Sequence, residues 1–167
     1  MSKIKVGING FGRIGRLVLR AAWGWPELEF VAINDPGADT HTLAHLLNFD
    51  SVHGPWSHEA SASGGEMVVE GKRITVTHNK AIGDTDWSDC DVVIEASGVN
   101  KKVAALQGYL DQGVKRVVAT APVKEAGAKN IVLGVNEHIF DPANDRILTA
   151  ASCTTNCLAP VVKVIHE

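Results

Sequence analysis

One stretch near the N-terminus decides the fold of this chain: Gly7-Ile8-Asn9-Gly10-Phe11-Gly12-Arg13-Ile14-Gly15-Arg16. It begins inside residues 3–9, where apolar side chains occupy every second position, and this period of two predicts a β-strand. Three glycines follow the strand at positions 10, 12 and 15. Beyond them apolar residues recur at a helical period, and we expect a helix that buries one face formed by Ile14, Leu17, Val18 and Ala21.

An acidic residue stands at the end of the next expected strand. Residues 28–34 predict this strand, which closes on Asp35, 20 positions after Gly15. Strand, glycine loop, helix, strand and acid at this spacing are typical of a dinucleotide-binding fold. A glycine loop by itself is weak support, because such loops also serve as structural turns. Asp35 taken alone is also compatible with a strand-end cap.

Each part of this motif has a physical purpose in binding a dinucleotide. Gly10 permits a tight turn, Gly12 lets the backbone approach a pyrophosphate, and Gly15 lets the helix pack closely on the strand. The first turn of the helix offers N–H groups to the phosphates. Asp35 accepts hydrogen bonds from ribose hydroxyls and repels a 2′-phosphate, so the sequence predicts NAD as the cofactor in preference to NADP.

The remaining chain continues with helices and strands in alternation. The expected elements are helices over residues 39–50 and 101–112, and strands over residues 91–98, 114–121, 131–135 and 146–150. Residues 66–78 alternate around Glu70-Gly71 and predict a hairpin. The expected fold class is therefore α/β: a doubly wound, mostly parallel sheet of the Rossmann type with a small antiparallel insertion. Its ligand crevice is expected outside the carboxyl ends of the parallel strands.

Composition excludes several classes of function. Hydrophobic residues make up 45% and charged residues 21% of the chain, which is typical of a globular protein. The net charge is −3 and the basic residues are scattered, so no nucleic-acid partner is expected. No apolar run reaches the length of a membrane span. Because the first residues run directly into a strand and not into a signal peptide, we expect a cytoplasmic location.

The chain has three cysteines: Cys90, Cys153 and Cys157. A small odd number argues against a disulfide framework and fits a reducing compartment. Cys153 and Cys157 share one helix face, but no further ligands stand nearby in the sequence, so no metal site is expected.

A second stretch, which surrounds one of these cysteines, contains side chains suited to catalysis: Ala151-Ser152-Cys153-Thr154-Thr155-Asn156-Cys157-Leu158-Ala159-Pro160. Cys153 opens an expected helix, whose free N–H groups and dipole favour the nucleophilic thiolate. The alternative is structural, with Ser152 or Thr154 as a helix cap beside a buried, inert cysteine. The position of Cys153 at the carboxyl edge of the sheet, facing the glycine loop across the crevice, favours the catalytic interpretation. Pro160 is expected to bend or interrupt the helix.

Along its whole length the chain resembles the family of phosphorylating glyceraldehyde-3-phosphate dehydrogenases. The segments that carry the resemblance are residues 7–16, Asn34-Asp35, Asp50-Ser51, His53-Gly54, 134–136 and 151–160. The resemblance implies an NAD-dependent oxidation of glyceraldehyde 3-phosphate in glycolysis and gluconeogenesis. Cys153 attacks the aldehyde, a hydride passes to nicotinamide to leave a thioester, and inorganic phosphate releases the product as an acyl phosphate. Members of this family form homotetramers.

The resemblance also implies roles for individual residues. Ser152 and Thr154 match positions that contact the attacking phosphate, and the N–H of Cys153 helps to hold the oxyanion. The implied cofactor-binding residues are Gly10, Phe11, Gly12, Arg13, Ile14, Gly15, Asn34, Asp35, Ser97, Gly98 and Thr120. One departure is Val123, where many members have serine. Similar loops occur in a branch associated with arsenate resistance.

The domain boundary is expected near the reactive cysteine. Residues 1–151 form the dinucleotide-binding domain, and residues 152–167 form the first helix of a catalytic domain whose remainder is absent from this sequence. The family's general-base histidine lies in that second domain. His166 is not this base, because at 1.5 Å per residue the helix carries it roughly 20 Å from Cys153. Two hypotheses stay open: the NAD-binding half of a dehydrogenase, or an isolated NAD-binding module without turnover.

Overall fold

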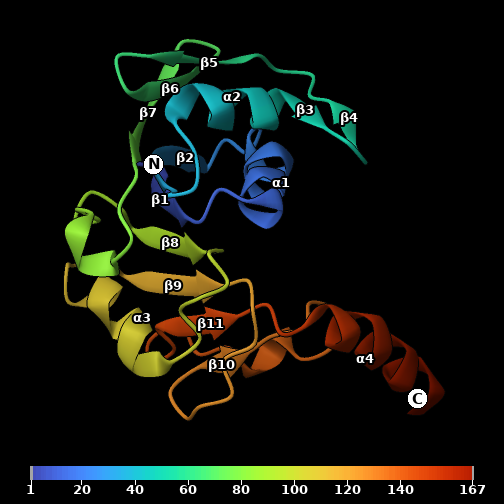
Figure 1. Ribbon diagram of the computed structural model, residues 1–167. Coiled ribbons are helices and arrows are strands. Elements are labelled where there is room, and N and C mark those ends of the chain that lie inside the picture. The colour runs from blue at the N-terminus through green and yellow to red at the C-terminus, as the bar shows by residue number, and fades with distance from the viewer. Residues whose placement is uncertain (1, 167) are drawn as a thin grey trace.

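The centre of the molecule is a nine-stranded sheet (Figure 1). This computed structural model describes residues 2–166. Across the sheet the strand order is β10-β11-β9-β8-β1-β2-β7-β6-β5. The strands are β1 (Ile4–Asn9), β2 (Leu28–Asn34), β5 (Ala60–Ser63), β6 (Glu66–Val69), β7 (Lys72–Thr77), β8 (Val92–Glu95), β9 (Arg116–Ala119), β10 (Lys129–Asn130) and β11 (Ile147–Thr149).

The sheet is parallel from β10 to β7 and antiparallel at its β6–β5 edge. The predicted hairpin joins β6 and β7 through Glu70 and Gly71, which have φ of 50° and 78°, as a two-residue turn of this kind requires. The mostly parallel α/β fold and its antiparallel addition are thus confirmed. The antiparallel strands extend the main sheet through β7. A separate two-stranded sheet pairs β3 (Phe49–Asp50) with β4 (Gly54–Pro55).

The described chain has four α-helices, of which the first three pack on the sheet. They are α1 (Arg13–Ala22), α2 (Thr40–Asn48), α3 (Val103–Leu110) and α4 (Cys153–His166), with single 3₁₀ turns at Ile82–Asp84 and Glu137–Ile139. Val6 and Ile8 of β1 pack in one apolar cluster with α1 and α2. Gly7, between them, faces Trp87 of a second cluster that includes α3. Because successive strand residues point to opposite faces, the two clusters lie on opposite sides, as in a doubly wound fold.

Helix α1 buries a different face from the one the sequence predicted. Gly15 and Leu19 are buried, and Trp23 just beyond the helix continues the same row. Ile14 is 51% exposed and Ala21 is also exposed, so the expected face of apolar residues is wrong. The reason is that Gly15 meets the end of β1 and the loop after it: a Cβ at this position would lie 2.2 Å from the carbonyl oxygen of Gly10 and 3.2 Å from Cγ2 of Ile8. The closest approach of helix and strand therefore fixes the helix rotation.

Two further expectations near the C-terminal end are wrong. The strand predicted over residues 131–135 is replaced by Lys129–Asn130 and a turn that follows it. Pro160 does not interrupt α4, which continues from Cys153 to His166. Proline leaves the carbonyl of Asn156 without its helical donor, and Asn156 is exposed, so water can hydrate that carbonyl.

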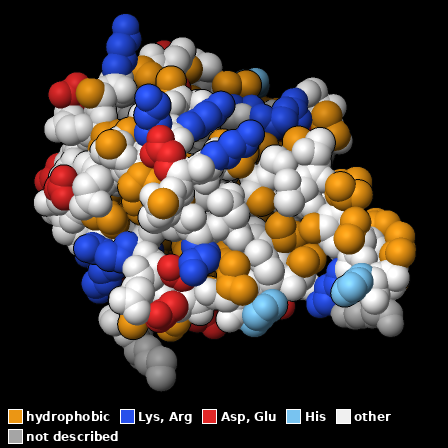
Figure 2. Space-filling view, turned by 90° about the horizontal axis from the view of Figure 1, so that it is seen from below, with side chains coloured by type: hydrophobic (Ala, Val, Ile, Leu, Met, Phe, Trp, Pro, Cys, Tyr) orange, Lys and Arg blue, Asp and Glu red, His pale blue; other side chains and the backbone are white. Residues whose placement is uncertain are grey.

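Helix α4 projects from the body of the molecule (Figure 1). It contains no buried residue among those described. Five apolar side chains on it are more than half exposed: Leu158, Val161, Val162, Val164 and Ile165. Figure 2 shows hydrophobic side chains gathered at that end of the molecule. Within residues 2–166, no helix has both the length and the apolar character needed to span a membrane.

Candidate functional site

The sheet has a topological switch point between β1 and β8. From β1 the chain proceeds to β2 on one side, and from β8 to β9 on the other. In open α/β sheets the ligand crevice lies at the carboxyl ends of the strands at such a point. Here those ends are Asn9, followed by the glycine loop, and Glu95, followed by Ser97 and Gly98.

The glycine loop has the shape that a pyrophosphate requires. Gly10 has φ of 89°, and a Cβ on it would lie 2.3 Å from the backbone nitrogen of Ser97. Gly12 instead faces open space, since a Cβ there would meet no atom within 4 Å. Gly12 also precedes α1 without any side-chain cap, so the first N–H groups of α1 stay free for an anion. The residues present therefore fit a dinucleotide phosphate.

Asp35 is joined to the loop by its side chain. Its Oδ2 accepts a hydrogen bond from the backbone N–H of Phe11 (2.6 Å), and its Oδ1 accepts one from Gly37 (2.7 Å). Each carboxylate oxygen keeps further acceptor capacity for a ligand hydroxyl. The ring of Phe11 is fully buried, so this residue anchors the loop in the core.

Asn34 supports the loop from the interior. It is 3% exposed, and its carbonyl accepts a hydrogen bond from the N–H of Gly10 (2.8 Å). Its side-chain amide donates to Oδ1 of Asn9 (2.8 Å), and its own Oδ1 accepts from the hydroxyl of Thr77 (2.8 Å). Any contribution of Asn34 to a cofactor site therefore passes through the loop that it holds.

The first turn of α1 presents one exposed apolar and one charged side chain. Ile14 is the exposed apolar residue. The guanidinium of Arg13 lies 3.1 Å from Oδ1 of Asp50, whose carboxylate also accepts the N–H groups of His53 and Val52. These two N–H groups, with the charge of Arg13, lower the pKa of Asp50 to about 2.

A buried acidic residue at the switch point is absent from our sequence-based expectations. Glu95 is 2% exposed, and its carboxylate contacts Asn9, Ser97, Asn100 and Tyr109. Burial and the neighbouring charge of Glu95 raise the pKa of Tyr109 far above its ordinary range. The available signal was an acid closing an otherwise apolar strand, Val92-Val93-Ile94-Glu95.

The other predicted cofactor residues also lie at strand ends. Ser97 is half-buried, and Gly98 is exposed with φ of 75°. Thr120 follows β9, and its N–H donates to the carbonyl of Glu95 (2.9 Å). The structure thus places the carboxyl ends of β1, β8 and β9 next to one another along one edge of the sheet.

Cys153 is the first residue of α4 and is exposed. Oγ of Ser152 accepts the N–H of Thr155 (3.1 Å) and so caps the helix. The structural alternative is correct about this cap but wrong about the cysteine, because the buried thiol is that of Cys90. Ala151 holds a left-handed conformation, with φ of 57°, immediately before this turn. A non-glycine residue with such a φ is sterically costly and is often found at functional sites.

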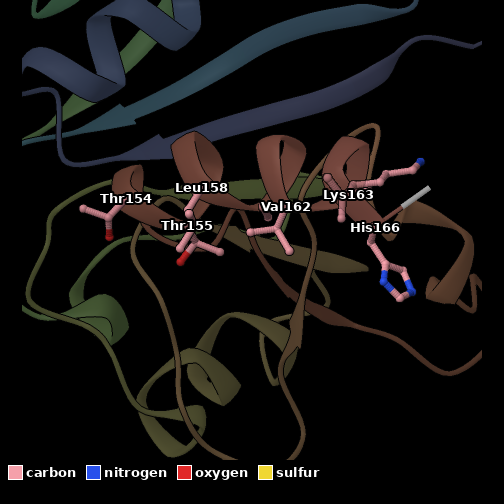
Figure 3. Close-up of a pocket in the computed structure, with 8 residues that line it drawn as sticks. Thr154, Thr155, Leu158, Val162, Lys163 and His166 are labelled. Atoms are coloured by element: carbon pink, nitrogen blue, oxygen red, sulfur yellow. The ribbon is translucent and has the colours of Figure 1, made fainter.

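The glycine loop and Cys153 follow the carboxyl ends of parallel strands in one sheet, β1 and β11. Two strands, β8 and β9, lie between them, so three strand spacings separate the two ends, roughly 14 Å. Cys153 is not among the residues that line a hollow of about 450 Å³ along α4, which is shown in Figure 3. Apolar side chains, among them Leu158 and Val162, make up half of its lining, and Thr154 is one of the polar residues there.

The fold, the glycine loop and the acidic residue Asp35 together place this chain in the class of dinucleotide-binding proteins. A family model described as "Glyceraldehyde 3-phosphate dehydrogenase, NAD binding domain" matches residues 4–103. The chain belongs to the glyceraldehyde-3-phosphate dehydrogenase family and carries its NAD-binding domain, which confirms the predicted family, fold and cofactor.

Curated relatives match over nearly the whole chain. Glyceraldehyde-3-phosphate dehydrogenase 3 of Nostoc sp. is 53% identical over 167 residues, which are 99% of this chain and 49% of the relative. Glyceraldehyde-3-phosphate dehydrogenase of Geobacillus stearothermophilus is 46% identical over 98% of this chain and 49% of the relative. The cytosolic glyceraldehyde-3-phosphate dehydrogenase of Chlamydomonas reinhardtii is 44% identical over 99% of this chain and 48% of the relative. The chain therefore spans about half the length of the curated relatives it matches.

Proposed function

We propose that this chain is the NAD-binding half of a phosphorylating glyceraldehyde-3-phosphate dehydrogenase of glycolysis and gluconeogenesis, and that it contributes the catalytic nucleophile Cys153. The observation that carries the proposal is the placement of an exposed thiol at the start of α4, on the same edge of the parallel sheet as the glycine loop. Thiols at helix starts in accessible positions are those that react.

The cofactor site in this proposal follows the carboxyl edge of the sheet. The glycine loop, residues 10–15, and the N-terminus of α1 hold the pyrophosphate, with Arg13 and Ile14 beside it. Asp35, supported by Asn34, accepts the ribose hydroxyls. Ser97, Gly98 and Thr120 line the path from the loop toward Cys153. Bound NAD supplies the acceptor for the hydride that leaves the substrate.

The chemistry of this chain's own residues centres on one sulfur. The Cys153 thiolate attacks the aldehyde carbon of glyceraldehyde 3-phosphate, and the backbone N–H of Cys153 stabilises the oxyanion that forms. Loss of hydride leaves a thioester on Cys153, which inorganic phosphate then attacks to release an acyl phosphate. Thr154 is exposed and Ser152 half-buried, and their hydroxyls lie 3.0 Å apart beside the thiol, which suits a phosphate contact.

The domain organisation and partners are part of the same proposal. Residues 1–151 form the cofactor domain, and residues 152–167 open a catalytic domain. The exposed apolar side chains of α4 support this boundary, because such side chains are normally covered. The whole protein is proposed to be a cytoplasmic homotetramer that binds neither nucleic acid nor membrane.

Binding and turnover assays test the proposal. A polypeptide of residues 1–167 should bind NAD in calorimetry but should not reduce it with glyceraldehyde 3-phosphate and phosphate. The family's general base is expected outside this segment, and such a base typically contributes about 10²–10⁴-fold. Turnover by residues 1–167, or no binding of NAD, would contradict the proposal. The mass of the intact polypeptide in its source shows whether a second domain follows.

Two alternatives make different predictions. An isolated NAD-binding module predicts binding without turnover even in the full-length natural polypeptide. The suggestion of a variant that acts in arsenate resistance is based on Val123. The structure buries Val123 fully in the cluster with α3, so its side chain has no exposed surface that an anion could contact. The structure therefore gives this branch no added support, and a comparison of phosphate and arsenate as co-substrates of the whole protein decides it.

A further inference from the structure

The backbone of Phe11, in the middle of the glycine loop, is held by side chains at both of its polar groups. Its N–H donates to Oδ2 of Asp35 (2.6 Å), and its carbonyl accepts a hydrogen bond from Nη1 of Arg16 (3.0 Å). Phe11 is fully buried, so water does not reach this carbonyl. Within residues 2–166 its hydrogen-bond donor is Arg16. Buried carbonyls are normally paired, and here the side chain of Arg16 supplies the pairing.

The direction of this carbonyl determines the direction of the next N–H. Phe11 and Gly12 are joined by a trans peptide, in which the carbonyl and the N–H that follows it point in opposite directions. Because the carbonyl of Phe11 points to Arg16, the N–H of Gly12 points away from Arg16. Gly12 is exposed, and its N–H has no protein acceptor within residues 2–166. This N–H is therefore free to donate to a phosphate oxygen of a dinucleotide.

Gly12 does not fix this direction by its own conformation. Glycine adopts positive and negative φ with similar ease, so the peptide between Phe11 and Gly12 can turn over when ψ before it and φ after it change. A Cβ at Gly12 would meet no atom within 4 Å, so the space around this residue permits such a turn. The next peptide is held by α1, because the N–H of Arg16 donates to the carbonyl of Gly12 (3.1 Å). The peptide between Phe11 and Gly12 is held by the guanidinium of Arg16.

No ion pair accounts for the position of the Arg16 side chain, which is half-buried. No carboxylate of residues 2–166 lies within 4.0 Å of its guanidinium, and its Nε is buried without a hydrogen-bond partner in the same part of the chain. Burial lowers the pKa of Arg16, although the charge of Asp50 acts in the opposite direction. A cation without a close counter-charge is costly to bury. The hydrogen bond to the loop carbonyl is therefore the contact that places this guanidinium.

We infer that Arg16 is a positioning residue of the cofactor site, which holds the peptide between Phe11 and Gly12 so that the N–H of Gly12 faces the pyrophosphate. This inference rests on the proposed function, because it requires NAD to place its pyrophosphate at the glycine loop. The adenosine end of NAD lies at Asp35 in the proposed site. Loss of the Arg16 contact should therefore weaken the binding of NAD and leave the binding of adenosine, which has no phosphate, unchanged.

The test compares the dissociation constants of NAD, by calorimetry, and of adenosine, by NMR titration, for the unmodified protein and for Arg16→Gln. The glutamine side chain ends well short of the position of Nη1, so the carbonyl of Phe11 loses its donor. We expect NAD affinity to fall by about fivefold to 50-fold, because the binding-competent direction of the peptide becomes a minor population. Adenosine affinity should change by less than about twofold, since the contacts of Asp35 remain.

Two further variants separate the contact from the charge and from the stability of α1. Arg16→Lys keeps the cation, but its ammonium also ends short of Nη1, so we expect the same selective loss of NAD affinity; this variant serves if Arg16→Gln fails to fold. Arg20→Gln is the matched control, because Arg20 donates to the carbonyls of Leu47 and Gly54, outside the glycine loop. It should lower stability without changing the ratio of the two affinities.

Three results would be decisive against these ideas. Full NAD affinity in Arg16→Lys would overturn the inference, because the charge of Arg16 would then suffice without the contact. Equal losses of NAD and adenosine affinity in the folded Arg16 variants would also overturn it and make Arg16 a support of the fold alone. Failure of the unmodified protein to bind NAD would instead refute the proposed function.

Discussion

The backbone N–H of Phe11 donates a 2.6 Å hydrogen bond to Oδ2 of Asp35, across 24 positions of sequence. This contact joins the end of β2 to the glycine loop after β1, so the acid and the loop form one rigid unit. Hydrogen bonds to charged groups stabilise more than neutral ones, typically by about 1.5–3 kcal/mol. Asp35 is therefore expected to shape the loop as well as to contact a ribose.

Asp35→Asn should reduce discrimination against NADP. The substitution removes the charge that repels a 2′-phosphate and weakens the acceptor for ribose hydroxyls, so NAD affinity should fall by about 1.5–3 kcal/mol, or roughly 10- to 150-fold. Calorimetric titration with NAD and NADP measures the ratio. Asp39→Asn is the control, because Asp39 caps α2 through the N–H of Thr42 and asparagine caps equally well. A ratio unchanged in Asp35→Asn would refute the ribose role.

The variants Gly10→Ala and Gly12→Ala should lose different properties: the first should lose stability, and the second should lose affinity for NAD. At Gly10 the positive φ and the 2.3 Å approach to Ser97 make any Cβ costly, and we expect a loss of at least about 2 kcal/mol of unfolding free energy. At Gly12 a Cβ meets no protein atom, so stability should change by less than about 1 kcal/mol while NAD affinity falls. Thermal unfolding and NAD titration of both variants separate the effects. Normal NAD binding by Gly12→Ala would argue against a phosphate there.

The three cysteines should differ in their reaction with iodoacetamide. Burial, with the nearby charges of Asp89 and Asp91, raises the pKa of Cys90 to about 12, so at pH 8 it is almost entirely the unreactive thiol. Cys153 and Cys157 are exposed. Mass spectrometry should find Cys153 and Cys157 labelled in the folded protein and Cys90 labelled only after denaturation. Native labelling of Cys90 at the rate of the other two would contradict its burial.

Asp50 should make stability depend on pH in the acid range. Its folded pKa of about 2 lies below the ordinary value near 4, so the folded state binds the proton more weakly than the unfolded state. The stabilisation is present above about pH 4 and is lost as the pH falls toward 2. Urea unfolding of the protein and of Asp50→Asn between pH 5 and 2 should show the difference between them shrinking. A difference that is constant with pH would refute the predicted ionisation.

Local patterns predicted the glycine loop and the acid that the structure joins through the N–H of Phe11. The glycine spacing and the position of Asp35 follow from short-range constraints on φ, on backbone approach and on strand length, all readable within 30 residues. The exposed start of α4 at Cys153 follows from a similar local pattern. The strand over 131–135 was mispredicted because a short apolar run is compatible with a turn as well as a strand.

Other features depend on residues far apart in the chain. Asn9 and Tyr109 are 100 positions apart, yet they share a hydrogen bond and one carboxylate at the switch point. The burial of Glu95 therefore had no local signature beyond an acid at the end of an apolar strand. The rotation of α1 likewise depended on where Gly15 meets β1.

By itself, the sequence determined the family, the order of the main elements and the identity of the expected cofactor, because these follow from dihedral preferences and the spacing of a short motif. Only the tertiary structure decided which face of α1 is buried, how Asp35 is joined to Phe11, and that Glu95 is buried with Asn9 and Tyr109 donating hydrogen bonds to its carboxylate. The physical reason is that burial and pairing are set by neighbours brought together across the sheet, and a linear pattern does not encode their distances.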